Sequence, residues 1–223
     1  MRTVGARMAT GGGRGEGGDE QAAVMRAPSG RPRQFDEEQV LDQLVALFWR
    51  KGVSQTSMAD LVAATGVHKP SLYRTFGSKD ELVVLVLRRY LAERRALLGG
   101  IVDRARGGVQ GVHDFLDHFE SEVVDDSARD GCLMLVASSE FNGTLPGWEG
   151  FAAEYGDLFR ELLRPLIARV GGRAAVEPAV VDQRTEVLVM AIFGIQTAVR
   201  AGADAATSHA SFAALHAMVD TWV

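Results

Sequence analysis

Apolar side chains recur every three or four residues along almost the whole chain from Phe35 onward. This period is that of an amphipathic α-helix, and no window alternates apolar and polar residues as a half-buried strand would. The pattern predicts helices over roughly 37–51, 58–65, 69–76, 79–98, 109–123, 132–141, 151–170, 180–199 and a last one through Phe212 to Trp222. We therefore expect an all-α fold.

Three of the predicted helices start with a capping signal. In such a signal a Ser or Asp side chain bonds a backbone N–H of the first turn, and a polar side chain three residues later bonds back. The pairs are Asp36 with Gln39, Ser57 with Asp60, and Ser78 with Glu81. The helix after Ser78 is predicted to run to about Leu98, just before Gly99 and Gly100, and is long enough to join two domains.

Residues 1–34 are rich in Gly and Arg and contain almost no large apolar side chains, so they are expected to form a flexible basic arm. The chain as a whole has a net charge of -5, so any nucleic-acid binding requires a local basic surface. Its single cysteine, Cys132, excludes an intrachain disulfide and a cysteine-based zinc site. No segment resembles a signal peptide or a membrane span, so a cytoplasmic location is expected.

Residues 57–76 have the layout of a helix-turn-helix, because two short helices are separated by a turn that contains Gly66. In the second of these helices Leu72 and Phe76 are four residues apart and are expected to face inward. Lys69 and Tyr73 are also four apart and lie on another face, which is free to meet DNA.

Many residues at fixed spacing in this region resemble the signature of the tetracycline-repressor family of DNA-binding regulators. They are Gly30-Arg31-Pro32-Arg33, Thr56-Ser57-Met58, Gly66-Val67, Leu72-Tyr73, Phe76-Gly77-Ser78-Lys79 and Leu82. The resemblance covers roughly residues 31 to 90, and the rest of the chain resembles the family only in being helical.

The resemblance implies a role in DNA binding for eleven residues. It places Thr56 and Ser57 beside a phosphate, the segment from His68 to Arg74 in the major groove, and Tyr73 and Lys79 on the DNA backbone. The family often has a small polar residue where His68 stands. The candidate DNA-binding residues are Arg31, Arg33, Thr56, Ser57, His68, Lys69, Pro70, Ser71, Tyr73, Arg74 and Lys79.

Six of these residues also have a purely structural interpretation. Tyr73 alone is compatible with an edge of the core, and Lys69, Arg74 and Lys79 with a solvated charged surface. Arg31 and Arg33 are either tail charges or an arm that enters the minor groove.

The resemblance further implies that the carboxy-terminal helices form a homodimer and bind a small-molecule effector, which we expect to be largely apolar. The expected dimer surface is Phe151 to Val170 together with Val180 to Val199. The candidate ligand-binding residues are Phe115, Phe119, Cys132, Met134, Trp148 and Phe193. Gly131-Cys132 is similar to a stretch in electrophile-responsive family members, although a buried packing role for this cysteine is the alternative.

The sequence contains no catalytic constellation and no phosphate-binding glycine loop, so neither an enzyme nor a cofactor is expected. No metal site is expected either, because His113 and His118 are five residues apart and off the helical register.

We therefore predict a DNA-binding regulator, most simply a repressor, with a helix-turn-helix domain over residues 35–80 and a regulatory and dimerisation domain over 81–223. The alternatives are a helical small-molecule-binding protein or enzyme with incidental helix-turn-helix geometry, and a DNA-binding scaffold without a ligand.

Overall fold

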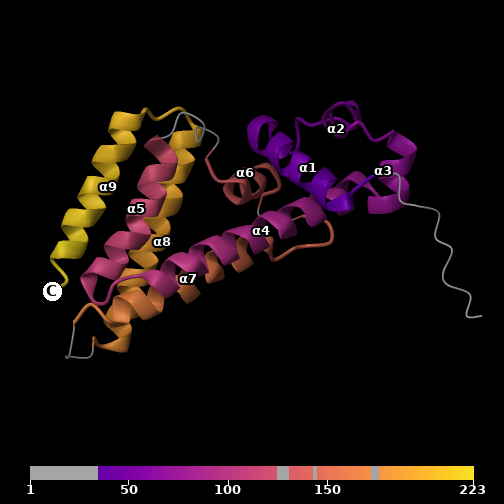
Figure 1. Ribbon diagram of the computed structural model, residues 1–223. Coiled ribbons are helices and arrows are strands. Elements are labelled where there is room, and N and C mark those ends of the chain that lie inside the picture. Colours follow the sequence, from indigo (N-terminus) through magenta and orange to yellow (C-terminus); the bar gives the residue numbers. More distant parts are fainter. Residues whose placement is uncertain (1–34, 125–130, 143–144, 172–175) are drawn as a thin grey trace, which may run out of the picture. The chain divides into compact units, whose positions relative to one another are not determined.

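The computed structural model describes residues 35–124, 131–142, 145–171 and 176–223. These residues form nine α-helices and no strand, so the predicted all-α fold is confirmed (Figure 1). The helices are α1 (Glu37–Lys51), α2 (Met58–Thr65), α3 (Lys69–Phe76), α4 (Lys79–Arg104), α5 (Val109–Val124), α6 (Leu133–Glu140), α7 (Phe151–Ala168), α8 (Pro178–Arg200) and α9 (Ala205–Asp220).

Helices α1, α2 and α4 begin at the residues that the capping signals predict. Ser57 and Ser78 each form a complete capping box, with Asp60 and Glu81 as the reciprocal acids. The Asp36 carboxylate accepts the N–H groups of Glu38 and Gln39 at the start of α1. The backbone bonds of these first turns are therefore satisfied locally.

Helix α4 is longer than the sequence indicates. The expected end at Gly99 and Gly100 is wrong, because the helix continues to Arg104. Two glycines cost a helix only about 2 kcal/mol, and Ile101 and Val102 beyond them pack against the hydrophobic core. Tertiary packing thus outweighs the local preference.

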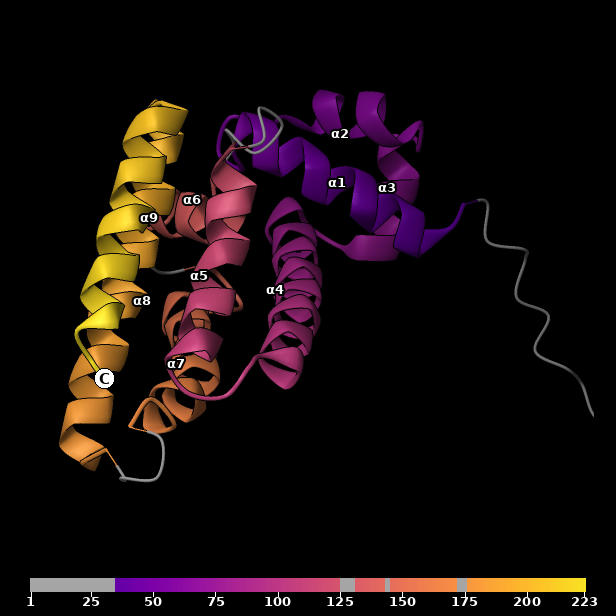
Figure 2. The ribbon, with the colours of Figure 1, turned by 60° about the vertical axis from the view of Figure 1, so that its left-hand side comes forward.

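Helix α4 lies between two groups of helices (Figures 1 and 2). It packs against α1 and α3 of the first group, and against α5, α6 and α7 of the second. Helices α7 and α8 pair closely, and α9 packs along α5. A continuous hydrophobic core joins all these helices, from Val40 in α1 to Val219 in α9.

None of the helices in the described part of the chain combines the length and the apolar character needed to cross a bilayer.

Candidate nucleic-acid interface

The turn between α2 and α3 is set by Gly66, which adopts the left-handed conformation with φ 67° and donates its N–H to the carbonyl of Val62. Side chains with a Cβ avoid this conformation, so a glycine is favoured here. Buried Val67 follows, and His68 caps α3 through its backbone alone. Pro70 lies in the first turn of α3, where its missing N–H has no partner to lose.

Helix α3 has one buried face and one exposed face. Leu72 and Phe76 are buried, and the Phe76 ring lies 6.2 Å from that of Phe35. Tyr73 is 42% exposed, and Lys69 and Arg74 are exposed beside it. The sequence-based division of this helix into a packing face and an outward face is therefore confirmed.

The exposed face of α3 carries positive charge and hydrogen-bond donors. The Lys69 ammonium lies 5.7 Å from the centre of the Tyr73 ring, and Arg74 Nη2 donates to Ser71 Oγ at 3.3 Å. Among the described residues nothing accepts a hydrogen bond from the Tyr73 hydroxyl, and α3 contains no acidic residue. This face therefore combines donors and charge suited to an anionic partner.

The residues next to α3 are already engaged within the chain. Thr56 is buried, and its hydroxyl donates to the carbonyl of Gly52 at 2.6 Å. Ser57 is exposed but bonds Asp60 in the capping box. Lys79 Nζ donates to the carbonyl of Val53 at 3.2 Å, which leaves two of its three N–H donors for another partner.

The acidic side chains near this surface are held by local partners. Hydrogen bonds from Lys51 and Ser57 hold the pKa of Asp60 well below its usual range. The backbone N–H and hydroxyl of Ser78 likewise lower the pKa of Glu81. Their negative charge is thus partly neutralised by the helix starts that they cap.

Most of the eleven candidate DNA-binding residues are brought together by this arrangement. His68, Lys69, Pro70, Tyr73 and Arg74 are all exposed on or before α3, and Ser71 is half-buried there. Arg31 and Arg33 lie outside the described residues.

Four hydrogen bonds connect the region around α1 to the carboxy-terminal helices. The Glu140 carboxylate at the end of α6 accepts the backbone N–H groups of Val53 and Ser54, at 2.8 and 2.9 Å. Trp49 Nε1 donates to the carbonyl of Gly131 at 2.6 Å, and Arg200 Nη1 donates to the carbonyl of Trp49 at 2.9 Å. The end of α1 is therefore fixed to both α6 and the end of α8.

A cavity of about 340 Å³ lies beside these connections, between α6, α8 and the loop that leads to α2. Of the candidate ligand-binding residues only Cys132 lines it. The other lining residues are Gln55, Leu135, Val136, Ser139, Glu140, Gln196, Thr197, Arg200 and Ala201. Sequence reasoning missed this set, because its members come from three segments far apart in the chain.

The other candidate ligand-binding residues pack against neighbours in the core. Phe115, Phe119 and Met134 are almost fully buried, and Phe119 and Phe193 both pack on the ring of Phe159. Trp148 packs on Phe151 and donates its indole N–H to Glu154.

Cys132 is buried between two tyrosines. Its thiol donates to the Tyr155 hydroxyl at 3.0 Å, and the Tyr90 hydroxyl donates to its sulfur at 3.7 Å. Burial raises the pKa of both tyrosine hydroxyls, so they remain neutral donors and acceptors. The neighbouring Asp125, Asp126 and Asp130 lie outside the described residues.

The sequence is similar to curated bacterial regulators over part of its length. It is 48% identical over 72 residues to the transcriptional repressor ComR of Escherichia coli strain K12, covering 32% of this chain and 34% of ComR. It is 31% identical over 106 residues to the repressor BdcR of the same strain, covering 48% of this chain and 54% of BdcR. The chain thus spans about a third to a half of the curated relatives it matches.

The fold is similar to solved structures over most of the described chain. The tetR-family regulator CifR, in a cysteine-mutant form complexed with 26-base-pair double-strand operator DNA, superposes with a TM-score of 0.67 at 26% identity. That match covers 83% of this chain and 98% of CifR. The model of the bacterial regulatory proteins of the tetR family matches residues 40–86, from the middle of α1 into α4. The similarity to the tetR family is therefore concentrated in α1 to α4, and the likeness in fold extends over most of the chain.

Proposed function

We propose that this protein is a transcriptional repressor that binds a palindromic operator as a homodimer and is released from it by a small molecule. The observation that carries the proposal is the exposed face of α3, which presents Lys69, Tyr73 and Arg74 from a helix anchored by Leu72 and Phe76. The operator DNA in the CifR complex supports the same role for this chain.

An α-helix fits the major groove of B-DNA, and a helix-turn-helix places its second helix there. In our proposal residues 35–80 form the DNA-binding domain, with Arg74 and Lys69 at base edges and the Tyr73 hydroxyl and Lys79 on phosphates. Ser57 adds a helix start that faces the backbone. Thr56 supports the loop before α2 through its bond to Gly52.

We infer that the dimer forms through α8 and α9. Val187 and Met190 on α8 are large apolar side chains that are 48% and 55% exposed. Beside them an open groove of about 430 Å³ between α8 and α9 is lined mostly by small residues, with Ile195 and Leu215 among them. The apolar face of α7, in contrast, is buried within the same chain.

A dimer is expected because one recognition helix reads too few bases for useful specificity, and a two-fold axis doubles the contacts. Sedimentation at micromolar concentration is expected to show a dimer, and Met190→Asp is expected to shift it to monomer and weaken binding to a palindrome. The matched control is Glu154→Gln, which removes an exposed charge from α7. A wild-type chain that stays monomeric with and without DNA would contradict the proposal.

The cavity beside α6 is where we propose that the effector binds. Its wall includes Glu140, whose carboxylate holds Val53 and Ser54, and Arg200, which holds the carbonyl of Trp49. A ligand that displaces these bonds releases the end of α1 and so favours a state in which α3 no longer fits the operator. The mixed lining suits a small molecule with a polar group and an apolar part.

Effector and operator are expected to weaken each other's binding by the same factor, typically about 5- to 150-fold. We would screen metabolites by thermal stabilisation and titrate each hit against free and operator-bound protein by fluorescence anisotropy. Glu140→Gln is expected to reduce the coupling, whereas Glu154→Gln leaves it unchanged. If a compound stabilises the protein without any effect on operator affinity, it is not the regulator.

Selection of bound duplexes from a random DNA pool tests the function itself. We expect enrichment of an inverted repeat. We also propose that the protein acts in the cytoplasm, because the bacterial chromosome is there. A helical enzyme or carrier with incidental helix-turn-helix geometry would enrich nothing. A scaffold without a ligand would enrich a repeat but show no effector coupling.

A further inference from the structure

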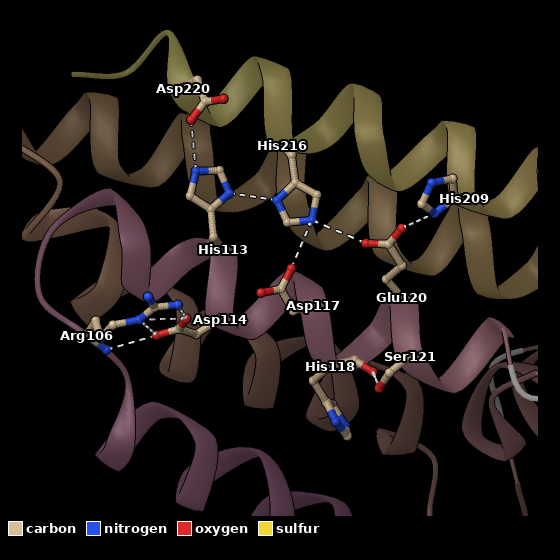
Figure 3. Close-up of polar contacts among 10 residues, drawn as sticks. All are labelled: Arg106, His113, Asp114, Asp117, His118, Glu120, Ser121, His209, His216 and Asp220. Carbon is tan, nitrogen blue, oxygen red and sulfur yellow. Dashed lines mark hydrogen bonds and ion pairs between the residues drawn. The ribbon is translucent and has the colours of Figure 1, made fainter.

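Histidine and carboxylate side chains form a cluster between α5 and α9 (Figure 3). Its members are His113, Asp117 and Glu120 on α5, and His209, His216 and Asp220 on α9. On each helix the spacings of three, four or seven residues place the side chains on one face. The cluster shares no residue with the exposed face of α3 or with the cavity beside α6.

The centre of the cluster is formed by His216, Asp117 and Glu120. His216 Nε2 lies 3.4 Å from Asp117 Oδ1 and 3.5 Å from Glu120 Oε2. These separations exceed the usual range of about 2.7–3.2 Å for an N–H···O hydrogen bond. His216 Nε2 is buried and has no hydrogen-bond partner among the described residues.

The same separations suit a shared metal ion. Two ligands bound to a tetrahedral ion at about 2.0–2.1 Å are about 3.3–3.4 Å apart. All three ligand atoms also lie within 4.8 Å of one another, so one ion can reach them together.

The hydrogen bonds of His113 and His216 determine which ring nitrogen of His216 is free to bind a cation. His113 Nε2 lies 2.9 Å from Asp220 Oδ1, so a neutral His113 carries its hydrogen on Nε2. Its Nδ1 then accepts from His216 Nδ1, 2.6 Å away, which leaves a lone pair on Nε2 of a neutral His216. Without a cation that lone pair faces two carboxylate oxygens. Among the described residues no lysine or arginine forms an ion pair with Asp117 or Glu120.

The surrounding residues hold the ligands in place. The Asp220–His113 pair fixes the tautomer of His216, as outer partners of metal-binding histidines do. His209 Nδ1 contacts the second oxygen of Glu120, Oε1, and so orients that carboxylate. An imidazole with two carboxylates suits Zn²⁺ and its first-row neighbours, whereas Mg²⁺ and Ca²⁺ prefer oxygen ligands alone.

We propose that Asp117, Glu120 and His216 bind a divalent transition-metal ion, with Zn²⁺ as the representative ion and water completing its coordination. The bound ion links α9 to α5, two helices that already pack along each other. The sequence did not suggest this site, because its histidine and its carboxylates are about 100 residues apart. His113 and His118, the histidine pair within one helix, do not bind the ion together.

The test is a titration of the full-length, chelator-treated protein with ZnCl₂ by calorimetry, with MgCl₂ as the second ion. We expect one Zn²⁺ per chain and no Mg²⁺. His216→Gln and the double variant Asp117→Asn/Glu120→Gln are expected to lower the affinity by about 100-fold or more. His113→Gln, which removes an outer partner, is expected to lower it by about 10- to 100-fold.

Asp103→Asn is the matched control, since it removes an exposed carboxylate from the last turn of α4 and is expected to leave the affinity unchanged. Thermal melts without metal establish that each variant folds, and added Zn²⁺ is expected to raise the melting temperature of the wild type but not of His216→Gln. No Zn²⁺ binding at micromolar concentration, or equal binding by wild type and His216→Gln, would overturn the proposal without affecting the proposed DNA binding.

Discussion

Glu122→Gln is expected to destabilise the folded chain by about 3–5 kcal/mol, because it leaves a buried arginine without its counter-ion. Arg94 on α4 is 6% exposed, and its guanidinium binds the Glu122 carboxylate on α5 through Nη1 and Nη2. His118 Nε2 approaches the same carboxylate at 3.4 Å, too far for a good hydrogen bond. Among the described residues, both hydrogen bonds that this carboxylate accepts therefore come from Arg94, and His118 adds a nearby imidazole.

The pH dependence of stability distinguishes this pair from ordinary packing. Burial would raise the pKa of Glu122, but His118 and Arg94 lower it to about 2, against 4.5 for an ordinary glutamate. A depressed folded-state pKa gives stability that is complete above about pH 4.5 and is lost as the pH falls towards 2. The shift corresponds to about 3 kcal/mol.

Urea unfolding of wild type and Glu122→Gln between pH 7 and pH 2 measures this contribution. We expect a stability gap of about 3–5 kcal/mol at pH 7 that shrinks as the pH falls below 4.5, since a protonated glutamate resembles glutamine. Glu161→Gln breaks the exposed pair with Arg95 and is expected to cost at most about 1 kcal/mol. A gap that stays constant with pH would refute the assignment.

Substitutions on α3 and at the first residue of α4 are expected to separate into two groups. Arg74→Ala and Lys69→Ala each remove a group proposed to read bases, at a cost of about 1–3 kcal/mol on the preferred operator and with a change in the preferred sequence. Tyr73→Phe and Lys79→Ala each remove a group proposed to contact phosphate and are expected to weaken binding on all sequences alike. For Lys79→Ala the slope of log Kd against log salt is expected to fall by about 1.

Parallel selections with each variant measure both preference and affinity, and thermal melts report the loss of the Lys79 bond to Val53. Arg95→Ala, on the exposed surface of α4, removes a positive charge outside the proposed interface and is the matched control. If Tyr73→Phe changed the preferred sequence without lowering affinity, its hydroxyl would not be on a phosphate.

Local signals predicted most of the fold. Capping pairs such as Ser57 with Asp60 act within one turn, and stripes such as Leu72 with Phe76 show which face is buried, so a single sequence is enough to place them. The predicted end of α4 was wrong because Ile101 and Val102 pack against the core. This packing depends on other helices, so it could not be recognised from the two glycines that precede these residues.

The outward face of α3 was predictable for the same reason, because it consists of the residues that lie opposite the buried Leu72 and Phe76. The engagement of Thr56 with Gly52, the cavity beside α6 and the cluster between α5 and α9 were not. Each depends on residues brought together by folding, such as Glu140 with Val53 at a separation of 87 residues.

The central claim is that the exposed face of α3 binds a specific DNA sequence. Its most direct test is fluorescence anisotropy of the selected duplex with wild type and Arg74→Ala, over a series of salt concentrations. We expect two chains per duplex, an affinity that falls steeply with salt, and a preference over a scrambled duplex that is reduced or redirected in Arg74→Ala. Equal binding of the selected and scrambled duplexes, or no difference between wild type and Arg74→Ala, would contradict the claim.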